Sequence, residues 1–344
     1  MRIYGLPAYR PHHVGYVILA IRGATAVQAL QRFIILLYDT SWGRSVISAN
    51  QDDPLYQFTN DFSRLSHADI VVFHVPTAPD LSRIRKYPGQ KWVACSLESD
   101  VNYPQMRDPQ YMARFDFTMT YRWDADVPLM YWGPELRPLL LRPPGPKTAP
   151  APAVFFSSNL RERSGRTQYV RELMRHIQVD CYGRAFPNRQ LAGDRGRESK
   201  LVTLSRYRFD LAFENSVSRD YVSEKFFDPL VAGCVPVYRG APNIEDFAPG
   251  DHCFISAADF GGPQDLAAYL QHLTHNPAEY AAYFAWKERP LRESFIKKIE
   301  IAEKDPFHRL AALLLARGCA PRRHGTWEAL AGLWRRRSNA CSYP

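Results

Sequence analysis

The sequence predicts an α/β fold in two domains, on three observations. The chain has 344 residues, more than one compact core usually takes. Short apolar runs of strand length recur along it, and most are continuous rather than alternating, as in parallel strands that are buried on both faces. A stretch at 141–152, LRPPGPKTAPAP, carries five prolines, so it cannot hold a helix or a central strand. We therefore expect two domains joined by this linker, with a ligand in the cleft between them.

Strands dominate the predicted elements of residues 1–140. Polar turn material separates five runs that are rich in Val, Ile, Leu and Phe. The expected strands are 17–21, 33–38, 70–74, 92–96 and 117–121.

After the linker, strands and helices alternate, which is typical of a parallel sheet covered by helices. The helix at 223–233 begins with a serine and ends at a glycine, and that at 263–273 begins with a proline. The expected strands are 154–157, 179–182, 210–213, 235–238 and 254–256, and the expected helices 166–177, 223–233, 263–273 and 278–288.

The composition excludes some classes of protein. Forty-six per cent of the residues are hydrophobic and 23% are charged, so the chain is neither wholly disordered nor fibrous. The net charge of +9 suggests an anionic partner, but no RNA-binding or zinc-knuckle motif is present, and we expect no nucleic acid. The six cysteines match neither a disulfide framework nor a zinc site. No apolar run reaches the ~20 residues that a bilayer span needs, and no signal peptide is evident.

The segment at 213–240, FENSVSRDYVSEKFFDPLVAGCVPVYRG, is the most informative one. Ser223 suits the N-cap of a helix and Glu224 suits its positive end. Lys225 in the first turn opposes the helix dipole unless an anion lies nearby. A phosphate would accept both the free backbone N–H groups and the lysine charge, although a solvated surface lysine would explain the spacing alone.

The wider string resembles the α-1,3-fucosyltransferases of glycosyltransferase family 10. The resemblance rests on FENS at 213–216, DYVSEK at 220–225 and AGCVPV at 232–237. The continuation GAPNIEDFAP at 240–249 looks closest to the branch that includes core α-1,3-fucosyltransferases. Upstream, LES at 97–99 is similar to the family's Glu-Ser-Pro segment, and TMTYR at 118–122 followed by DADVP at 124–128 is similar to another family segment.

The resemblance implies a GT-B fold of two Rossmann-like domains whose parallel sheets face a central cleft. Residues 1–140 would bind the acceptor, 141–152 would form the linker, 153–315 would bind GDP-fucose and 316–344 would form a basic tail. The activity implied is an inverting transfer of L-fucose from GDP-fucose to a glycan hydroxyl, with O-3 of a GlcNAc-type residue expected. The alternative is a GT-B transferase that uses another nucleotide sugar.

The family also implies roles for single residues. Arg166 and Lys225 would hold the diphosphate, Glu224 would bind the ribose, and Asn215 and Tyr221 would line the donor pocket. Glu98 would be the general base that takes the acceptor proton. Ser158 and Asn159 belong to the first strand–helix segment of the donor domain and are secondary candidates.

Two departures from the family pattern matter. Asp100 stands where the family usually has proline, which puts two carboxylates near the expected base. The assignment of Glu98 therefore stays open to Asp100 or Glu214. In addition, Pro229 lies inside the helix expected after Lys225, where it should kink or shorten that helix.

GT-B enzymes generally do without a metal, so we expect no metal site and no required cofactor, although stimulation by Mn²⁺ or Mg²⁺ stays open. We therefore interpret Asp124 and Asp126 as a cap or turn. The tail contains six arginines and one acid. It could bind an anionic membrane surface or pack as a helix on the N-terminal domain. The expected location is cytoplasmic and peripheral on the inner membrane, or the Golgi if the protein is eukaryotic with an incomplete N-terminus.

Overall fold

The computed structural model describes residues 31–38, 53–133, 135–160, 162–191 and 193–322. They form two compact units. One unit draws its described residues from 1–95, 115–117 and 307–344, and the other comprises 96–114 and 118–306. The boundaries that we predicted between the two domains and their linker, at residues 140 and 152, stay predictions.

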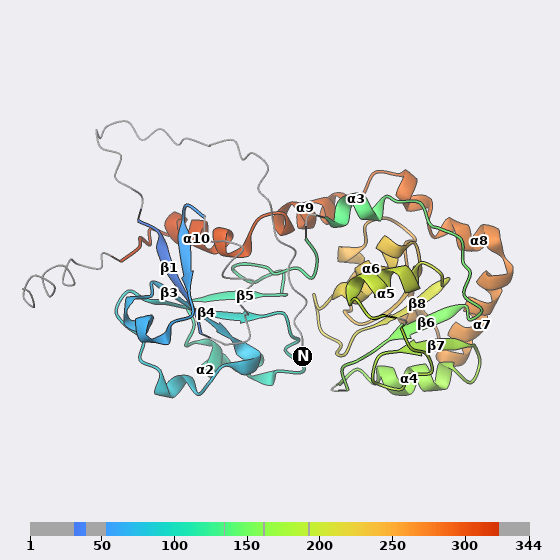
Figure 1. The fold of residues 1–344 in the computed structure, drawn as a ribbon, viewed down its shortest axis with the longest axis horizontal. Coiled ribbons are helices and arrows are strands. Elements are labelled where there is room, and N and C mark those ends of the chain that lie inside the picture. The colour runs from blue at the N-terminus through green and yellow to red at the C-terminus, as the bar shows by residue number, and fades with distance from the viewer. Residues whose placement is uncertain (1–30, 39–52, 134, 161, 192, 323–344) are drawn as a thin grey trace, which may run out of the picture. The chain divides into compact units, whose positions relative to one another are not determined.

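The first sheet has five strands in the order β2-β1-β3-β4-β5 (Figure 1). β1 pairs in parallel with β2 and with β3, and β3 pairs in parallel with β4. Every residue of β1 is buried, as expected for a continuous apolar strand covered on both faces. The strands are β1 Phe33–Leu37, β2 Tyr56–Thr59, β3 Ile70–His74, β4 Lys91–Ser96 and β5 Phe117–Thr120.

The second sheet also has five strands, in the order β10-β9-β8-β6-β7, and all its pairs are parallel. Its strands are β6 Ala153–Phe156, β7 Val179–Tyr182, β8 Phe209–Phe213, β9 Val235–Arg239 and β10 Ile255–Ser256. Two parallel sheets flanked by helices confirm the predicted α/β class.

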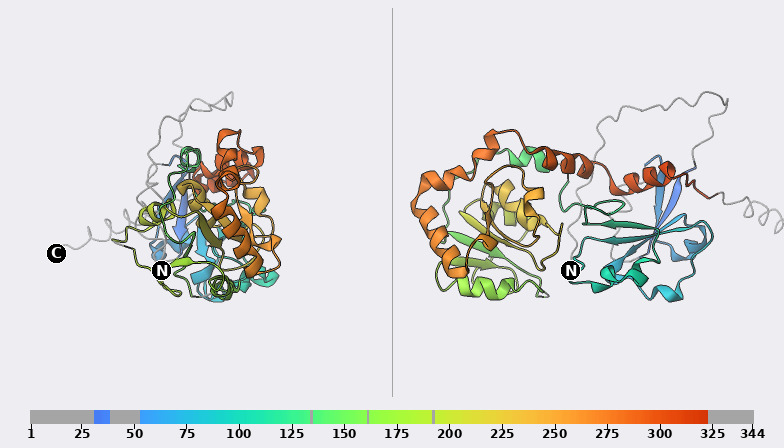
Figure 2. Two further views of the ribbon diagram at one scale, coloured as in Figure 1. Left: turned by 90° about the vertical axis from the view of Figure 1, so that its right-hand side faces the viewer. Right: turned by 180° about the vertical axis from the view of Figure 1, so that it is seen from behind.

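Helices pack on both faces of the second sheet. Leu211 and Phe213 of β8 belong to a core shared with α4 (Arg166–Leu173) and α7 (Pro263–His275). Ala212, which points to the opposite face, packs in a core with α6 (Glu224–Ala232) and α9 (Glu293–Ala302). Figure 2 shows the orange helices α7 and α8 along one side of this sheet. The other helices of this unit are α2 Pro109–Met112, α3 Leu136–Leu140, α5 Arg197–Leu204 and α8 Pro277–Ala282.

After Pro306 the chain returns to the first unit. Helix α10 (Pro306–Ala316) places the ring of Phe307 edge-on to Phe58 of β2, with 4.8 Å between the centroids. Beyond it, the backbone N–H of Arg322 donates to Asp69 Oδ1 at 2.8 Å. The beginning of the predicted tail thus packs on the N-terminal sheet.

The remaining arginines of the tail lie outside the described residues, so a membrane contact stays a prediction. They are Arg323, Arg335, Arg336 and Arg337.

Several elements differ from those expected. The helix expected at 166–177 ends at Leu173, and the one expected at 278–288 is divided into α8 and the short 3₁₀ helix Ala285–Glu288. Helix α6 runs through Pro229 to Ala232. The strand expected at 17–21 lies outside the described residues. β2, α2, α3, α5, α9 and α10 were not expected.

The other 3₁₀ helices lie in connections between these elements. They are η2 Phe62–His67, η3 Val75–Thr77, η4 Leu81–Arg83, η5 Pro104–Arg107, η6 Ile244–Phe247 and η7 Ala257–Asp259. The five described cysteines are free, and all except Cys319 are buried.

Candidate active site

The N-terminus of α6 carries the predicted lysine in a carboxylate-rich setting. Ser223 caps the helix by accepting a hydrogen bond from the backbone N–H of Lys225. Lys225 Nζ donates to Ser223 Oγ at 2.9 Å and to Glu224 Oε1 at 3.0 Å, and lies 3.5 Å from Glu214 Oε2. Burial alone would lower the pKa of Lys225, but the attraction of the two glutamates outweighs it and raises the pKa. The ammonium therefore stays charged beside the helix N-terminus.

Glu224 completes this pair as a carboxylate. Burial works to raise its pKa, but Lys225 and Lys200 outweigh that effect and hold the pKa of Glu224 at about 2. Lys200 is itself fixed from the neighbouring helix α5, since its Nζ donates to the fully buried Asp228 at 2.9 Å. Both charges at the start of α6 are thus permanent at neutral pH.

Glu214 follows β8 directly and is fully buried. Its carboxylate accepts hydrogen bonds from the backbone N–H and the hydroxyl of Ser223, at 2.7–2.9 Å. Burial is the main cause that raises the pKa of Glu214. Gly240 passes so close that a Cβ there would lie 2.5 Å from Tyr238 Oη and 2.6 Å from Glu214 Cγ, so a side chain at this position would force the tyrosine, the glutamate or the backbone to move.

Arg166, the first residue of α4, is 1% exposed. Its guanidinium donates to the carbonyl oxygens of Phe213 (2.9 Å) and Asn159 (3.2 Å) and to Ser157 Oγ (3.0 Å). Its Nε is buried and has no hydrogen-bond partner within the described part of the chain. Burial lowers the pKa of Arg166, and nearby carboxylates, Glu214 first among them, oppose this. The guanidinium therefore joins the carboxyl ends of two strands, and its predicted contact with the diphosphate stays a prediction.

Glu98 lies in the loop that leaves β4. Ser96 Oγ holds the loop, because it accepts from the N–H of Glu98 and donates to its carbonyl oxygen, both at 3.0 Å. The Tyr131 hydroxyl donates to the carbonyl oxygen of Leu97. Burial raises the pKa of Glu98, and Lys225 pulls it in the opposite direction. Glu98 therefore lies near enough to the start of α6 to feel its charges.

Asp100, two residues later, has a different environment. Tyr121 Oη donates to Asp100 Oδ1 at 2.8 Å, Ser218 Oγ donates to the same oxygen at 2.7 Å, and Arg107 binds both carboxylate oxygens at 2.9 and 3.2 Å. Burial would raise the pKa of Asp100, but these donors outweigh it and bring the pKa to about 2. Asp100 is thus an ionised anchor whose oxygens are already occupied.

Asn215 and Tyr221, which we expected to line the donor pocket, border these charged residues. Asn215 Oδ1 accepts from Asn102 Nδ2 at 3.1 Å. Tyr221 is 2% exposed, and its ring contacts Tyr121 and Tyr131 edge-on, with centroids 5.1 and 6.0 Å apart.

Near Arg166 the two secondary candidates differ in exposure. Ser158 is exposed, whereas Asn159 is half-buried and offers its carbonyl oxygen to Arg166. The structure thus groups Glu98, Glu214, Glu224, Lys225 and Arg166 electrostatically, and it assigns Asp100 to a separate network.

Sequence reasoning missed two charged residues that support the site. One is Lys200, which faces Glu224 from α5. The other is Glu162, whose carboxylate accepts from Ser164 Oγ at 3.0 Å and from the backbone N–H of Arg166 at 3.2 Å, so it occupies the N-terminus of α4. The available signal was an acid four residues before a helix that begins at Arg166.

The aspartates at 124 and 126 make local bonds. Asp126 Oδ2 accepts from the backbone N–H of Thr118 at 2.9 Å, and Asp124 pairs with Arg122 at 3.0 Å. Within the described ranges no group of three or more His, Cys, Asp or Glu side chains is arranged to hold a metal ion. In the same ranges, no helix is long and apolar enough to cross a bilayer.

Comparison with known proteins matches most of the chain to one family. The model of the fucosyltransferase N-terminal domain matches residues 30–132, and that of the glycosyltransferase family 10 (fucosyltransferase) C-terminal domain matches residues 147–312. The chain is 39% identical over 239 residues to alpha-(1,3)-fucosyltransferase 7 of Mus musculus, covering 66% of this chain and 57% of that protein. It is 43% identical over 145 residues to GDP-fucose protein O-fucosyltransferase 3 of Gallus gallus, covering 40% and 30%. The chain therefore spans less than two thirds of either relative.

A solved structure has the same fold. The crystal structure of an alpha1,3-fucosyltransferase with GDP-fucose aligns with a TM-score of 0.54 at 18% identity, over 82% of this chain and 94% of that one. This likeness confirms the predicted GT-B fold with its two Rossmann-like units. The matched domains include the loop after β4 and the start of α6, and the chain belongs to glycosyltransferase family 10, the fucosyltransferases.

Proposed function

We propose that this protein is an inverting fucosyltransferase that moves L-fucose from GDP-fucose to a glycan hydroxyl, with O-3 of a GlcNAc-type residue as the target. One observation carries the proposal: the Glu98 carboxyl, with a raised pKa, lies within electrostatic reach of the Lys225 ammonium at the N-terminus of α6. A base and a fixed cation are the two groups that a single displacement from a sugar diphosphate needs.

The reaction is a one-step exchange of bonds. The acceptor oxygen attacks the anomeric carbon of fucose while Glu98 takes its proton, and the bond from that carbon to the diphosphate oxygen breaks as GDP leaves. Attack from the face opposite the leaving group inverts the anomeric configuration. Of the three candidate carboxylates, Glu98 is the best suited to this role. Asp100 is held ionised by three donors, and Glu214 is fully buried against Ser223.

The donor would lie with its diphosphate at the start of α6. Lys225 and the helix N-terminus would stabilise the negative charge that grows on the departing GDP. Glu224, ionised at neutral pH, would accept hydrogen bonds from the ribose hydroxyls, with Asn215 and Tyr221 bordering the pocket. Arg166 would add a buried positive charge behind the phosphates. No cofactor is needed in this scheme, and a stimulating effect of Mn²⁺ or Mg²⁺ is left to experiment.

Fewer observations support the choice of acceptor than the choice of donor. The name of the mouse relative specifies an α-(1,3) linkage, which supports position 3. The name of the chicken relative specifies transfer to protein, which makes a protein hydroxyl the competing acceptor. A GlcNAc-type sugar follows from the family resemblance, and it is the choice that the experiment must test.

The test is to incubate the chain with GDP-fucose and either N-acetyllactosamine, free GlcNAc or a serine- and threonine-containing protein, and to measure GDP release. NMR of the product gives its linkage and anomeric configuration. We expect transfer to the GlcNAc residue with inversion. Faster turnover with GDP-mannose or UDP-galactose than with GDP-fucose would instead favour a GT-B transferase of another nucleotide sugar, and product of retained configuration would refute the single displacement.

A further inference from the structure

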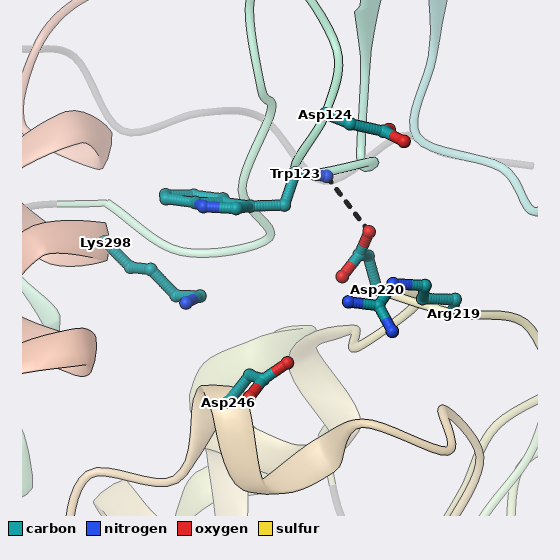
Figure 3. Close-up of a pocket in the computed structure, with 6 residues that line it drawn as sticks. All are labelled: Trp123, Asp124, Arg219, Asp220, Asp246 and Lys298. Carbon is teal, nitrogen blue, oxygen red and sulfur yellow. Dashed lines mark hydrogen bonds between the residues drawn. The ribbon is translucent and has the colours of Figure 1, made fainter.

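A cavity of about 190 Å³ opens beside the residues discussed above (Figure 3). It lies within a single compact unit, where the loop after β5, the loop between β8 and α6, η6 and α9 meet. Asp220 directly precedes Tyr221, so the cavity adjoins the candidate active site along the chain. The lining residues are Trp123, Asp124, Arg219, Asp220, Asp246 and Lys298.

Lys298 is a hydrogen-bond donor in the lining of this cavity. It is 6% exposed, and Figure 3 shows its side chain reaching from α9 toward the space beneath Trp123. Its Nζ lies 4.5 Å from the centroid of the Trp123 ring and 5.1 Å from that of Phe247. Within the part of the chain that the structure describes, no hydrogen bond or ion pair reaches this ammonium, which can donate three.

Two aspartates lie close enough to Lys298 to favour its charged form. Burial lowers the pKa of Lys298, while Asp246 and Asp220 oppose the shift. The ammonium lies over two aromatic rings, and its N–H groups have no acceptor among the described residues, so an oxygen of a ligand in the cavity could accept from it. The cavity is therefore prepared for a group with oxygen acceptors.

Asp220 fixes the wall that carries Trp123. Its φ of 65° lies in the left-handed region, which is uncommon for a residue other than glycine. The backbone N–H of Trp123 donates to Asp220 Oδ2 at 3.2 Å, the dashed line in Figure 3, and Asn243 Nδ2 donates to Oδ1 at 2.8 Å. The N–H of Asp220 donates in turn to Asn243 Oδ1 at 2.9 Å. These bonds hold the indole across one side of the cavity and occupy Asp220.

Asp124 is paired with Arg122 through both oxygens, at 3.2 and 3.0 Å. Asp246 accepts from Asn243 Nδ2 through Oδ2 at 3.0 Å, and its Oδ1, which has no hydrogen-bond partner among the described residues, is the acceptor that it offers to the cavity.

The chemistry of the lining selects among ligands. Three carboxylates against two cations disfavour an anion, and in the described ranges these acids do not form a metal-binding group. An indole face, a carboxylate acceptor and an ammonium donor together fit a sugar ring, whose C–H face stacks on an aromatic ring while its hydroxyls donate and accept. With a volume of about 190 Å³, the cavity has room for one sugar ring.

We propose that this cavity binds a neutral sugar residue of the acceptor glycan, with Trp123 stacking on the ring, Lys298 donating to its oxygens and Asp246 accepting from its hydroxyls. This inference rests on the proposed function. It adds acceptor-binding residues to the proposed base and diphosphate site.

The test compares paired variants in the full chain. Lys298→Met removes the donor while keeping a long side chain, and Lys298→Arg keeps the charge; Trp123→Ala removes the stacking surface, and Trp123→Phe keeps it. With N-acetyllactosamine as the probe, we expect Lys298→Met and Trp123→Ala to raise the acceptor KM about tenfold, the loss of one charged hydrogen bond or one stacked ring. The KM for GDP-fucose should stay unchanged, and Lys298→Arg and Trp123→Phe should stay within about threefold of the wild type.

The outcomes separate this inference from the proposed function. A wild-type chain that turns over no GDP-fucose with any acceptor refutes the proposed function itself. Normal turnover with an acceptor KM that neither Lys298→Met nor Trp123→Ala changes refutes only the cavity. Tighter binding of a sialylated probe than of the neutral one, lost in Lys298→Met, also overturns it, because the cavity would then be an anion site. If Lys298→Met fails to fold, which thermal unfolding would reveal, the acceptor KM values of Trp123→Ala and Trp123→Phe decide whether the cavity binds the acceptor.

Discussion

Glu98 and Asp100 lie two residues apart in the loop after β4, yet their carboxyl groups have opposite electrostatic environments. Burial dominates at Glu98 and raises its pKa, with Lys225 as the opposing cation. At Asp100 the hydrogen bonds from Arg107, Ser218 and Tyr121 outweigh burial and lower the pKa to about 2. Burial without compensating donors at Glu98, and three donors that outweigh burial at Asp100, decide which of the two carboxylates can accept a proton.

The comparison assigns different tasks to the two residues. A carboxylate already bound by three side chains would have to lose those bonds on protonation, so it anchors the loop. A carboxyl with a raised pKa takes a proton more readily, which suits a general base.

Replacing the proposed base should have the largest effect. Glu98→Gln keeps the shape of the side chain but cannot take the acceptor proton, so we expect kcat to fall by about 10³-fold. The melting temperature should stay near that of the wild type, because the loop is held through the backbone of residue 98. Steady-state kinetics with GDP-fucose and N-acetyllactosamine measure the loss. If Asp100→Asn lowered kcat as far as Glu98→Gln does, the division of tasks would be wrong.

Replacing Lys225, the cation that opposes the rise in the Glu98 pKa, should have the second largest effect. Lys225→Met removes the fixed charge beside the departing diphosphate, and we expect kcat/KM to fall by about 10²-fold. Lys225→Arg is the matched control, since it keeps the charge at the start of α6 and should recover part of the activity. Equal losses in both variants would mean that the shape of the side chain matters, rather than its charge.

The start of α6 could be predicted from the sequence because its determinants are local. Ser223 as N-cap, Gly233 as C-cap and the strand before them lie within one short segment, and local capping chemistry placed the helix correctly. The two carboxylates beside Lys225 come from the same segment, since Glu214 follows β8 and Glu224 begins α6. The family motif then supplied what the local pattern could not, the expectation of GDP-fucose as the ligand.

The hydrogen-bond partners of Asp100 could not be predicted in this way. Its partners lie 7, 21 and 118 residues away in the sequence, so only the fold brings them together. Arg166 presents the same difficulty, because its burial depends on carbonyl groups at the ends of two strands. β2 was missed for a local reason: its four residues, YQFT, are half-buried in the middle and give no continuous apolar run.

Asp100 should matter more for stability than for turnover. We expect Asp100→Asn to lower the free energy of unfolding at pH 7 by about 1–2 kcal/mol. This figure follows from the lowering of the Asp100 pKa from 3.8 to about 2, and it is reduced because Arg107 is half-exposed and solvent screens its charge. A depressed pKa contributes stability above the unfolded value near 3.8, and that contribution is lost as the pH falls toward about 2. Urea unfolding at pH 7, 5 and 3 should thus show a gap between wild type and variant that is full at pH 5 and narrower at pH 3. Glu172→Gln, at an exposed ion pair on α4, is the control and should show almost no gap. A gap that widens toward pH 3 would contradict the assignment.

The smallest effect should be a shift in the pH profile. Because burial raises the pKa of Glu98, the acid limb of kcat/KM should lie above the ordinary glutamate range near 4.5. Glu224 adds to that rise, so Glu224→Gln removes a negative charge and should move the acid limb to lower pH even while it weakens donor binding. The measurement is kcat/KM against pH for wild type, Glu224→Gln and Glu172→Gln, the last of which should leave the limb in place. A limb that moved upward in Glu224→Gln would show that the titrating group is not Glu98, since the loss of a neighbouring negative charge can only make a carboxyl group more acidic.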